Sequence, residues 1–171
     1  MCGCQKQNLY IMKYLFCFLF FSTTIFAQSP IDNLLKKYNK KTIPYLSIDE
    51  FKKLDDAIIL DTREQKEFDV SHLNGAVCVG YDKFDAKKIK EKFKNLNDTI
   101  VVYCSVGIRS EIIGTKLKKM GYKNVYNLYG GIFEWKNKDE EVVDNDQKVT
   151  ENVHAFSKEW SKYLLNGKII Y

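Results

Sequence analysis

Proline and glycine are scarce in this chain, with 2 and 9 copies among its 171 residues. Hydrophobic residues still make up 45% of the total, so the composition excludes a collagen-like, low-complexity or wholly disordered chain. A chain of this length has room for one ordinary domain, for which about 100–200 residues is usual, with a real hydrophobic core.

Arginine is scarce too, because Arg63 and Arg109 are the only arginines among 27 basic residues. The formal net charge is +5, but Asp and Glu lie between the lysines along the chain, which is typical of a solvated surface of mixed sign. Nucleic acid is therefore not an expected partner. Arg makes paired hydrogen bonds to anions that Lys does not, so the places of these two arginines matter.

Several motifs are absent from the sequence as well. It contains no zinc-ligand spacing, no Walker loop, no glycine pattern for dinucleotide binding and no internal repeat. These absences argue against the corresponding metal, nucleotide and solenoid classes.

The N-terminus has the pattern of a secretory signal peptide. Lys13 precedes an apolar run over residues 14–21, and small residues follow up to Ala27. The run is shorter than the ~20 residues that a membrane span needs. We therefore expect residues 1–27 to be removed, with the mature chain starting near Gln28, carrying no stable membrane span and lying in the periplasm or outside the cell. A retained N-terminal anchor is the alternative, and Met12 is a second candidate start.

Cleavage at this site would change two counts. Residues 1–27 contain two lysines and no acid, so the net charge falls from +5 to +3. They also contain three of the five cysteines, which leaves Cys78 and Cys104. Two cysteines do not make a disulfide-stapled scaffold, so the question becomes whether one of them is reactive.

Strand and helix patterns alternate along the middle of the chain. Short apolar runs predict strands at residues 43–46, 57–60, 75–79, 99–103 and 124–128, and helical patterns fall at 47–54, 64–69, 82–96, 109–120 and 132–136. This alternation predicts an α/β fold, a small parallel β-sheet with helices on both faces. In such folds the chemistry lies where strands end and helices begin.

The remaining segments are expected to flank this domain, which we place at residues 43–137. Residues 28–42 are predicted to be a loose lead-in with a marginal helical turn. Residues 138–171 are predicted to be a linker followed by a C-terminal helix, because apolar residues there have the spacing of one helix face: Val153, Phe156, Trp160, Tyr163 and Leu164. We expect this helix to dock on the domain and extend its core; a segment that binds a partner or covers a pocket is the alternative.

The junction after the most apolar strand carries the chemistry. Cys104 follows that strand, Gly107 allows a tight turn, and a helix begins near Arg109. Backbone N–H groups and the positive end of the helix stabilise an anion there, and a thiol in that setting has its pKa lowered from ~8.5 toward ~3.5–7.5. Ser105 and Ser110 add hydroxyl donors. An inert buried cysteine is the competing interpretation, but Gly107, Arg109 and Ser110 at this spacing favour a reactive one.

Three stretches of the chain carry a family resemblance: residues 60–64 with 67–68 and 72–76, residues 102–111, and residues 125–132 with Trp135. In these stretches the chain resembles the rhodanese-like domains, a family of sulfurtransferases. The stretches follow in the family's order, the resemblance extends over roughly residues 43–137, and each stretch occurs once. Ser71 and Asn74 depart from the family's usual Gly and Pro, outside the loop after Cys104.

The resemblance implies sulfur transfer. Cys104 would take a sulfane sulfur from a donor such as thiosulfate, hold it as a persulfide and pass it to a thiol or to cyanide. The donor would be held by the loop residues Ser105, Val106, Gly107, Ile108, Arg109 and Ser110. No metal or organic cofactor is implied, and the partners are a small-molecule or protein sulfur donor and a thiol acceptor. A low-turnover binding or sulfur-carrier module is the alternative.

A related loop in phosphatases has five residues between its Cys and Arg. Here only four residues, 105–108, separate Cys104 from Arg109. A ring of N–H groups of that size fits one sulfur atom, which argues against phosphatase chemistry.

Other polar residues receive structural interpretations. Asp61 and Arg63 match the family's Asp-x-Arg and support the site, with Arg63 expected to pair with Glu64 or Glu67, or else to form a pocket wall. The remaining expectations are a structural His72, a surface-exposed His154, a buried and inert Cys78 and a core position for Trp135.

Overall fold

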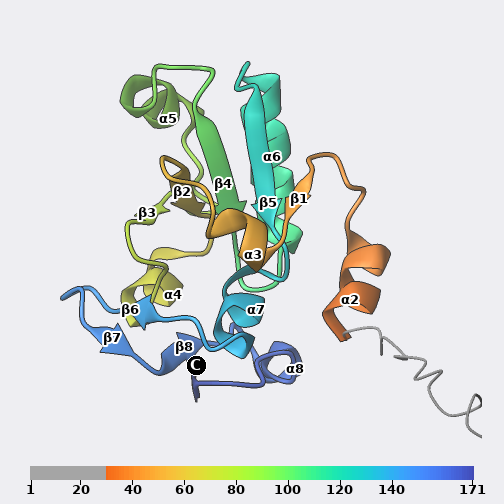
Figure 1. The fold of residues 1–171 in the computed structure, drawn as a ribbon, viewed down its shortest axis with the longest axis vertical. Helices are drawn as coiled ribbons and strands as arrows, with labels where there is room; N and C mark the ends of the chain where they lie inside the picture. The colour runs from red at the N-terminus through yellow and green to blue at the C-terminus, as the bar shows by residue number, and fades with distance from the viewer. Residues whose placement is uncertain (1–29) are drawn as a thin grey trace, which may run out of the picture.

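The computed structural model describes residues 30–171, so the predicted signal peptide and the expected start at Gln28 lie outside the described residues. Its centre is a five-stranded sheet of order β1-β5-β4-β2-β3 in which every pair is parallel (Figure 1). The strands are β1 Tyr45–Leu46, β2 Ile58–Asp61, β3 Val77–Cys78, β4 Thr99–Tyr103 and β5 Asn124–Leu128.

Helices follow or precede these strands in the alternation expected of an α/β fold. They are α2 Pro30–Tyr38, α3 Ile48–Phe51, α4 Gln65–Val70, α5 Ala86–Lys92, α6 Ile108–Lys119, α7 Gly131–Asn137 and α8 Lys158–Ser161. Within residues 30–171, none of the helices has both the length and the apolar character needed to cross a membrane.

Strand β4 separates two hydrophobic cores because its side chains alternate between the faces of the sheet. Val101 and Tyr103 belong to a core that also holds residues of α3, α7 and the C-terminal segment. Ile100 and Val102 belong to a second core with residues of α5 and α6. All four side chains are fully buried, as expected for a central parallel strand covered on both faces. The predicted sheet with helices on both faces is confirmed.

Local sequence signals explain several helix boundaries. The Ser47 hydroxyl accepts a hydrogen bond from the N–H of Glu50, whose carboxylate accepts one in return from the N–H of Ser47 (2.8 Å). This capping box starts α3 where the sequence predicts. Two of the helices are shorter than predicted: α3 ends at Phe51 rather than at residue 54, and α5 spans Ala86–Lys92 rather than residues 82–96.

The N-terminal segment is more ordered than the expected loose lead-in. Ile31, Leu34 and Leu35 of α2 are buried, at the spacing that places them on one helix face. After the helix, the Asn39 amide donates to the carbonyl oxygen of Gly107 (2.8 Å). The lead-in is therefore a packed helix in contact with the loop after Cys104, and the prediction of a marginal turn is wrong.

The predicted linker and C-terminal helix are also wrong. This segment forms two strand pairs, an antiparallel one of β6 Val142–Val143 with β7 Val149–Thr150 and a parallel one of β8 Asn152–His154 with β9 Lys168–Ile170. Phe156 has a φ of 63°, in the left-handed region, so no helix runs through it. Only the single turn of α8 is helical.

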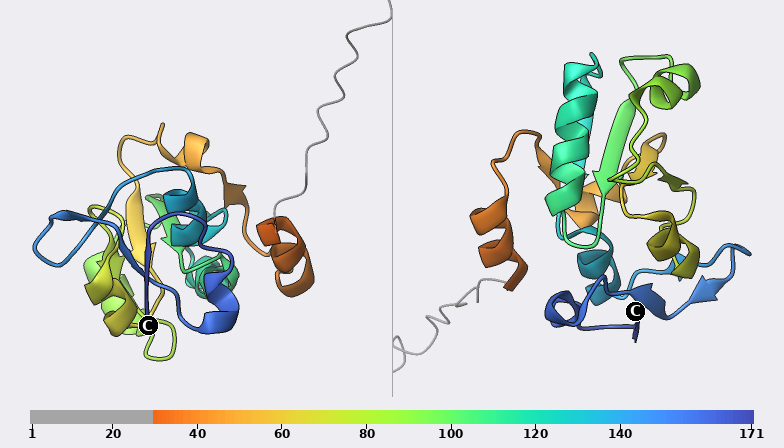
Figure 2. Two further views of the ribbon diagram at one scale, coloured as in Figure 1. Left: turned by 90° about the horizontal axis from the view of Figure 1, so that it is seen from below. Right: turned by 180° about the vertical axis from the view of Figure 1, so that it is seen from behind.

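The C-terminal segment nevertheless extends the core, as expected of a docked segment. Val142, Val153 and Leu164 are buried in the same core as α7. In the views of Figures 1 and 2 the segment lies at the end of the molecule where α7 and the loop after β4 are found. It therefore covers the carboxyl end of the sheet.

The N-terminus of helix α7 holds the loop after β4 in place through two backbone hydrogen bonds. The N–H of Ile132 donates to the carbonyl oxygen of Cys104 (2.9 Å), and that of Phe133 donates to the carbonyl oxygen of Ser105 (3.1 Å). Gly131 makes this approach possible, because a Cβ on it would lie 2.1 Å from the Cys104 oxygen. Its φ of 56° is also one that residues with a side chain rarely adopt.

Gly131→Ala is therefore expected to lower the free energy of unfolding in two ways, through the left-handed backbone conformation and through the clash of the new Cβ with the Cys104 carbonyl oxygen. Gly75→Ala is the matched control, because Gly75 has a φ of 75° but open space around its Cβ position. We expect the control to lower the free energy of unfolding in urea by about 1–2 kcal/mol and Gly131→Ala to cost a further ~1–3 kcal/mol through overpacking. Equal losses in the two variants would contradict the close approach.

Candidate active site around Cys104

The loop from Cys104 to Gly107 curls back over the cysteine sulfur. Gly107 has a φ of 105°, a conformation that favours glycine, and its N–H donates to Cys104 Sγ at 3.1 Å. Its carbonyl oxygen accepts hydrogen bonds from the amides of Asn127 and Asn39, both at 2.8 Å. Helix α6 begins at the next residue, Ile108, so its N-terminus lies beside the sulfur. The position of the loop over the sulfur is thus fixed by four parts of the chain: β4, α6, β5 and the N-terminal segment.

The pKa of the Cys104 thiol is lowered although the side chain is only 1% exposed. Burial is the largest single influence and raises the pKa. It is outweighed by the positive charge of Arg109, by hydrogen bonds from the backbone and hydroxyl of Ser110, and by the N–H of Gly107, all of which favour the thiolate. The predicted activation of Cys104 therefore has a structural basis.

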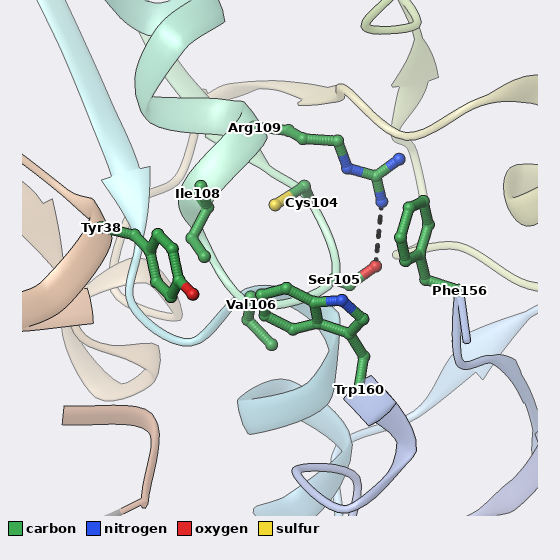
Figure 3. Close-up of a pocket in the computed structure, with 8 residues that line it drawn as sticks. All are labelled: Tyr38, Cys104, Ser105, Val106, Ile108, Arg109, Phe156 and Trp160. Carbon is green, nitrogen blue, oxygen red and sulfur yellow. Dashed lines mark hydrogen bonds between the residues drawn. The ribbon is translucent and has the colours of Figure 1, made fainter. Parts of the chain in front are cut away.

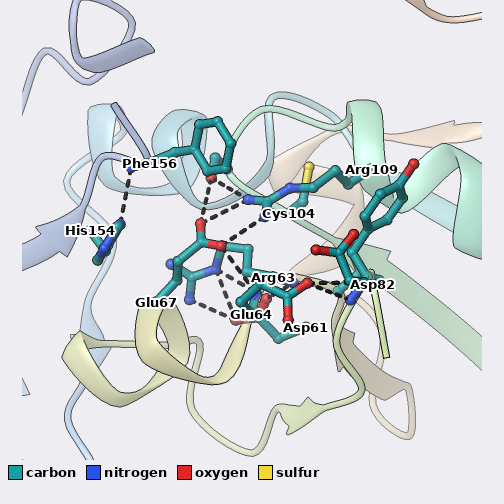
Figure 4. A network of polar contacts seen from close by, with 12 residues as sticks. Asp61, Arg63, Glu64, Glu67, Asp82, Cys104, Arg109, His154 and Phe156 are labelled. Atoms are coloured by element: carbon teal, nitrogen blue, oxygen red, sulfur yellow. Dashed lines mark hydrogen bonds and ion pairs between the residues drawn. The ribbon is translucent and has the colours of Figure 1, made fainter. Parts of the chain in front are cut away.

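Arg109 is held in place by Glu67. Its Nη1 donates to Glu67 Oε2 (2.7 Å) and its Nη2 to Glu67 Oε1 (2.8 Å), a two-pronged ion pair drawn in Figure 4. Nη2 also donates to the Ser105 hydroxyl (3.0 Å). The Glu67 carboxylate has no exposed surface; burial raises its pKa, but Arg109 outweighs that influence and the pKa is lowered. Both groups are thus charged, and the carboxylate neutralises the guanidinium.

The sequence predicts that Arg63 pairs with Glu64 or Glu67. This prediction is wrong, because Glu67 pairs with Arg109. Arg63 instead pairs with Asp61, through Nε to Oδ1 (3.0 Å) and Nη2 to Oδ2 (2.6 Å), and its Nη2 also donates to the carbonyl oxygen of Ser71 (2.7 Å). Both side chains of the Asp61–Arg63 pair are fully buried, and neither lines a cavity over Cys104. Their role is to fix the carboxyl end of β2 and the turn after α4. Glu64 binds elsewhere, to the N–H groups of Tyr81 and Asp82.

A cavity of about 270 Å³ opens above Cys104. Five of the predicted loop residues line it, namely Cys104, Ser105, Val106, Ile108 and Arg109. Gly107 and Ser110 do not; Ser110 is buried and donates to Asn127 (2.7 Å). These two residues act on the sulfur rather than on a ligand in the cavity.

The other walls of the cavity are aromatic and were missed by the sequence interpretation. Tyr38, Phe156 and Trp160 surround the cavity, and Figure 3 shows Cys104 between them. The Tyr38 and Trp160 rings lie 6.4 Å apart, and the Arg109 guanidinium lies 4.9 Å from the Phe156 ring. The C-terminal segment therefore does both things that the sequence leaves open: it packs on the core, and it covers a pocket. The apolar spacing of Phe156 and Trp160 is a signal in the sequence, but it predicts a helix rather than the wall of a cavity.

The remaining candidate residues have structural roles. His72 stacks on Phe68 with ring centroids 3.7 Å apart, away from the cavity lining. His154 is buried rather than at the surface, and its Nδ1 accepts a hydrogen bond from the N–H of Phe156 (3.0 Å). Burial, followed by Asp61, raises the pKa of the half-buried Cys78 to about 11, so Cys104 is the more acidic thiol. Residues 30–171 contain no cluster of side chains able to hold a metal ion.

These features define a class of protein: a parallel α/β domain whose reactive thiolate lies in a loop between a central strand and a helix. The family follows from the sequence of the same region, because residues 47–138 match the Rhodanese-like domain pattern. This chain belongs to the rhodanese-like domain family. The match covers strands β2 to β5 of the sheet and the Cys104 loop, but not strand β1 and not Tyr38, Phe156 or Trp160.

Two relatives of known name bear on the function of the domain. Over 106 residues the chain is 38% identical to a "tRNA uridine(34) hydroxylase" of Streptococcus suis (strain 05ZYH33), covering 57% of this chain and 32% of that protein. It is 35% identical over 106 residues to the "Putative sulfur carrier protein YrkF" of Bacillus subtilis (strain 168), covering 60% of this chain and 56% of that protein. The chain thus spans only part of each relative.

A solved structure supports the fold. "Thiosulfate sulfurtransferase from Pseudomonas aeruginosa" superposes with a TM-score of 0.56 at 23% identity, over 77% of this chain and 25% of the other. At this identity the likeness concerns the fold alone.

Replacing Arg109 by Gln is expected to make Cys104 less acidic, because the charge that favours its thiolate is removed. The thiolate forms as the pH rises through the pKa, so a raised pKa moves the alkylation of Cys104 by iodoacetamide to higher pH, by about one pH unit. The rate is followed by mass spectrometry in a Cys78→Ser background. Lys148→Gln removes an exposed charge and should leave the profile in place. An unchanged profile in Arg109→Gln would contradict the charge effect.

Proposed function

We propose that this protein is a sulfurtransferase that carries sulfane sulfur as a persulfide on Cys104. The observation that supports this most strongly is the setting of Cys104: an acidic thiol at the base of a cavity, with the Gly107 N–H directed at its sulfur. A thiolate is the attacking form in such chemistry. The same N–H group would stabilise the charge of the terminal persulfide sulfur.

The reaction has two displacement steps. The Cys104 thiolate attacks the outer sulfur of the donor, a new S–S bond forms, and the donor's own bond to that sulfur breaks with its electron pair. With thiosulfate as donor, sulfite leaves. A thiol or cyanide then attacks the outer sulfur of the persulfide, and the Cys104 thiolate is released. Charge and electrons balance without an added oxidant or reductant.

The names of the relatives bear on this proposal in different ways. Hydroxylation is named for streptococcal proteins of which the chain covers about a third, so we do not extend it to this chain. The name of the Bacillus subtilis protein favours our second candidate, a sulfur carrier that loads Cys104 but turns over slowly. Both candidates require a Cys104 persulfide and differ in the rate of its release.

Persulfide formation on Cys104 is the first expectation to test. After incubation with thiosulfate or another sulfane-sulfur donor, intact-mass analysis should show one added sulfur, about 32 Da. Peptide mapping should place it on Cys104. The control Cys78→Ser should load as the wild type does, because Cys78 has a raised pKa and does not line the cavity.

Cys104→Ser should remain unloaded with every donor. Loading of that variant, or of Cys78 in the wild type, would contradict the proposal. Repeated turnover of the loaded protein with cyanide or a thiol favours the enzyme, and a single slow release favours the carrier.

We also propose that the protein is exported. The support is the sequence pattern of residues 13–27, a lysine followed by a short apolar run and small residues. Expression of the full-length chain in a bacterial host with fractionation should give a mature protein whose N-terminal sequence starts near Gln28. Retention of a start at Met1 or Met12 would contradict export by this route.

A further inference from the structure

The aromatic walls of the cavity come from outside the region that matches the family pattern. Tyr38 is the last residue of α2, and Phe156 and Trp160 belong to the C-terminal segment, whereas the match spans residues 47–138. Tyr38 and Phe156 are both large apolar side chains that remain about half exposed, at 50% and 49%. Their exposed faces border the cavity over Cys104 (Figure 3).

Phe156 is held in this position by its surroundings. Its left-handed backbone conformation is costly for a residue with a side chain, by about 1–2 kcal/mol, and the His154 imidazole accepts its N–H. The conformation directs the ring over the Arg109 guanidinium, 4.9 Å away. A strained, half-exposed aromatic residue at a cavity over a reactive thiol points to a ligand rather than to folding alone.

The charge of the cavity is unfavourable for a small dianion. Cys104 supplies a negative charge of its own, Arg109 is the one cationic residue among those lining the cavity in the described chain, and both of its terminal nitrogens donate to the buried Glu67 carboxylate. A dianion such as thiosulfate would lose water among aromatic rings and meet a guanidinium that is already neutralised. Transfer of a charged group into such a setting is costly unless it is paired.

We propose that the cavity selects a sulfane-sulfur donor with a compact apolar organic group, and that Tyr38, Phe156 and Trp160 are specificity-determining residues for that group. This inference rests on the proposed function. An apolar cavity of about 150 Å³ is enough to take a benzene ring, so 270 Å³ has room for a ring and for the transferred sulfur with its leaving group.

The chemistry is the same displacement as above. With an organic thiosulfonate, R–SO₂–S⁻, the Cys104 thiolate takes the outer sulfur and the sulfinate R–SO₂⁻ leaves with the electron pair of the broken S–S bond. With an organic persulfide, R–S–S⁻, the thiolate R–S⁻ leaves. In both cases the group R stays in the cavity beside the aromatic rings during the step.

The test compares benzenethiosulfonate with methanethiosulfonate, two donors that differ only in R, and includes thiosulfate. Loading of Cys104 is followed by mass, and each rate is divided by the rate of the same donor with a free small thiol, which removes intrinsic reactivity. We expect the normalised preference for the phenyl donor over the methyl donor to be about 10-fold or more. Phe156→Ala and Tyr38→Ala should each lower that preference several-fold.

Tyr171→Ala is the matched control, since Tyr171 is 61% exposed and does not line the cavity; it should keep the wild-type preference. No normalised preference in the wild type, or an equal loss with both donors in the variants, would overturn the inference while leaving the persulfide mechanism intact. Failure of every donor to load Cys104 would instead overturn the proposed function.

Discussion

A negative charge on the buried sulfur of Cys104 is the constraint on which the site depends. Burial opposes that charge, and three neighbours offset it: the Gly107 N–H, the backbone and hydroxyl of Ser110, and the Arg109 guanidinium. Each of these is in turn fixed by something else in the fold. Gly107 is held through its carbonyl oxygen by two asparagine amides, and Arg109 is held by Glu67. The thiolate is thus a product of the folded protein and not of the loop sequence alone.

The two arginines explain how charge is managed at the carboxyl end of the sheet. Each has its own carboxylate, Asp61 for Arg63 and Glu67 for Arg109, and both carboxylates are fully buried. Removing one partner of such a pair leaves an uncompensated charge and costs about 3–5 kcal/mol. The Asp61–Arg63 pair fixes the backbone at the carboxyl end of β2 and after α4. The Glu67–Arg109 pair places a guanidinium beside the sulfur, and its carboxylate limits the attraction of that guanidinium for other anions. Figure 4 draws both pairs together with Cys104.

The sequence predicted the parts of the structure that local patterns determine. The apolar run before Cys104 and the capping box at Ser47 sit where they were expected, and so does the Cys104 loop with its activated thiol. Contacts between distant segments were not predictable in this way. Glu67 reaches Arg109 across 42 positions, and the aromatic walls join the two ends of the described chain. The spacing of Phe156 and Trp160 fits a helix equally well, and only the left-handed backbone at Phe156 distinguishes the observed turn.

Release of sulfur from Cys104 tests the central claim most directly, because a thiolate stabilised by its surroundings must also be a good leaving group. Protein loaded with sulfane sulfur is freed of donor and mixed with cyanide, and thiocyanate and protein mass are measured together. We predict one thiocyanate for each loaded chain and the return of Cys104 to its unmodified mass. Thiocyanate without a change at Cys104, or a persulfide on Cys104 that cyanide does not remove, would contradict the account.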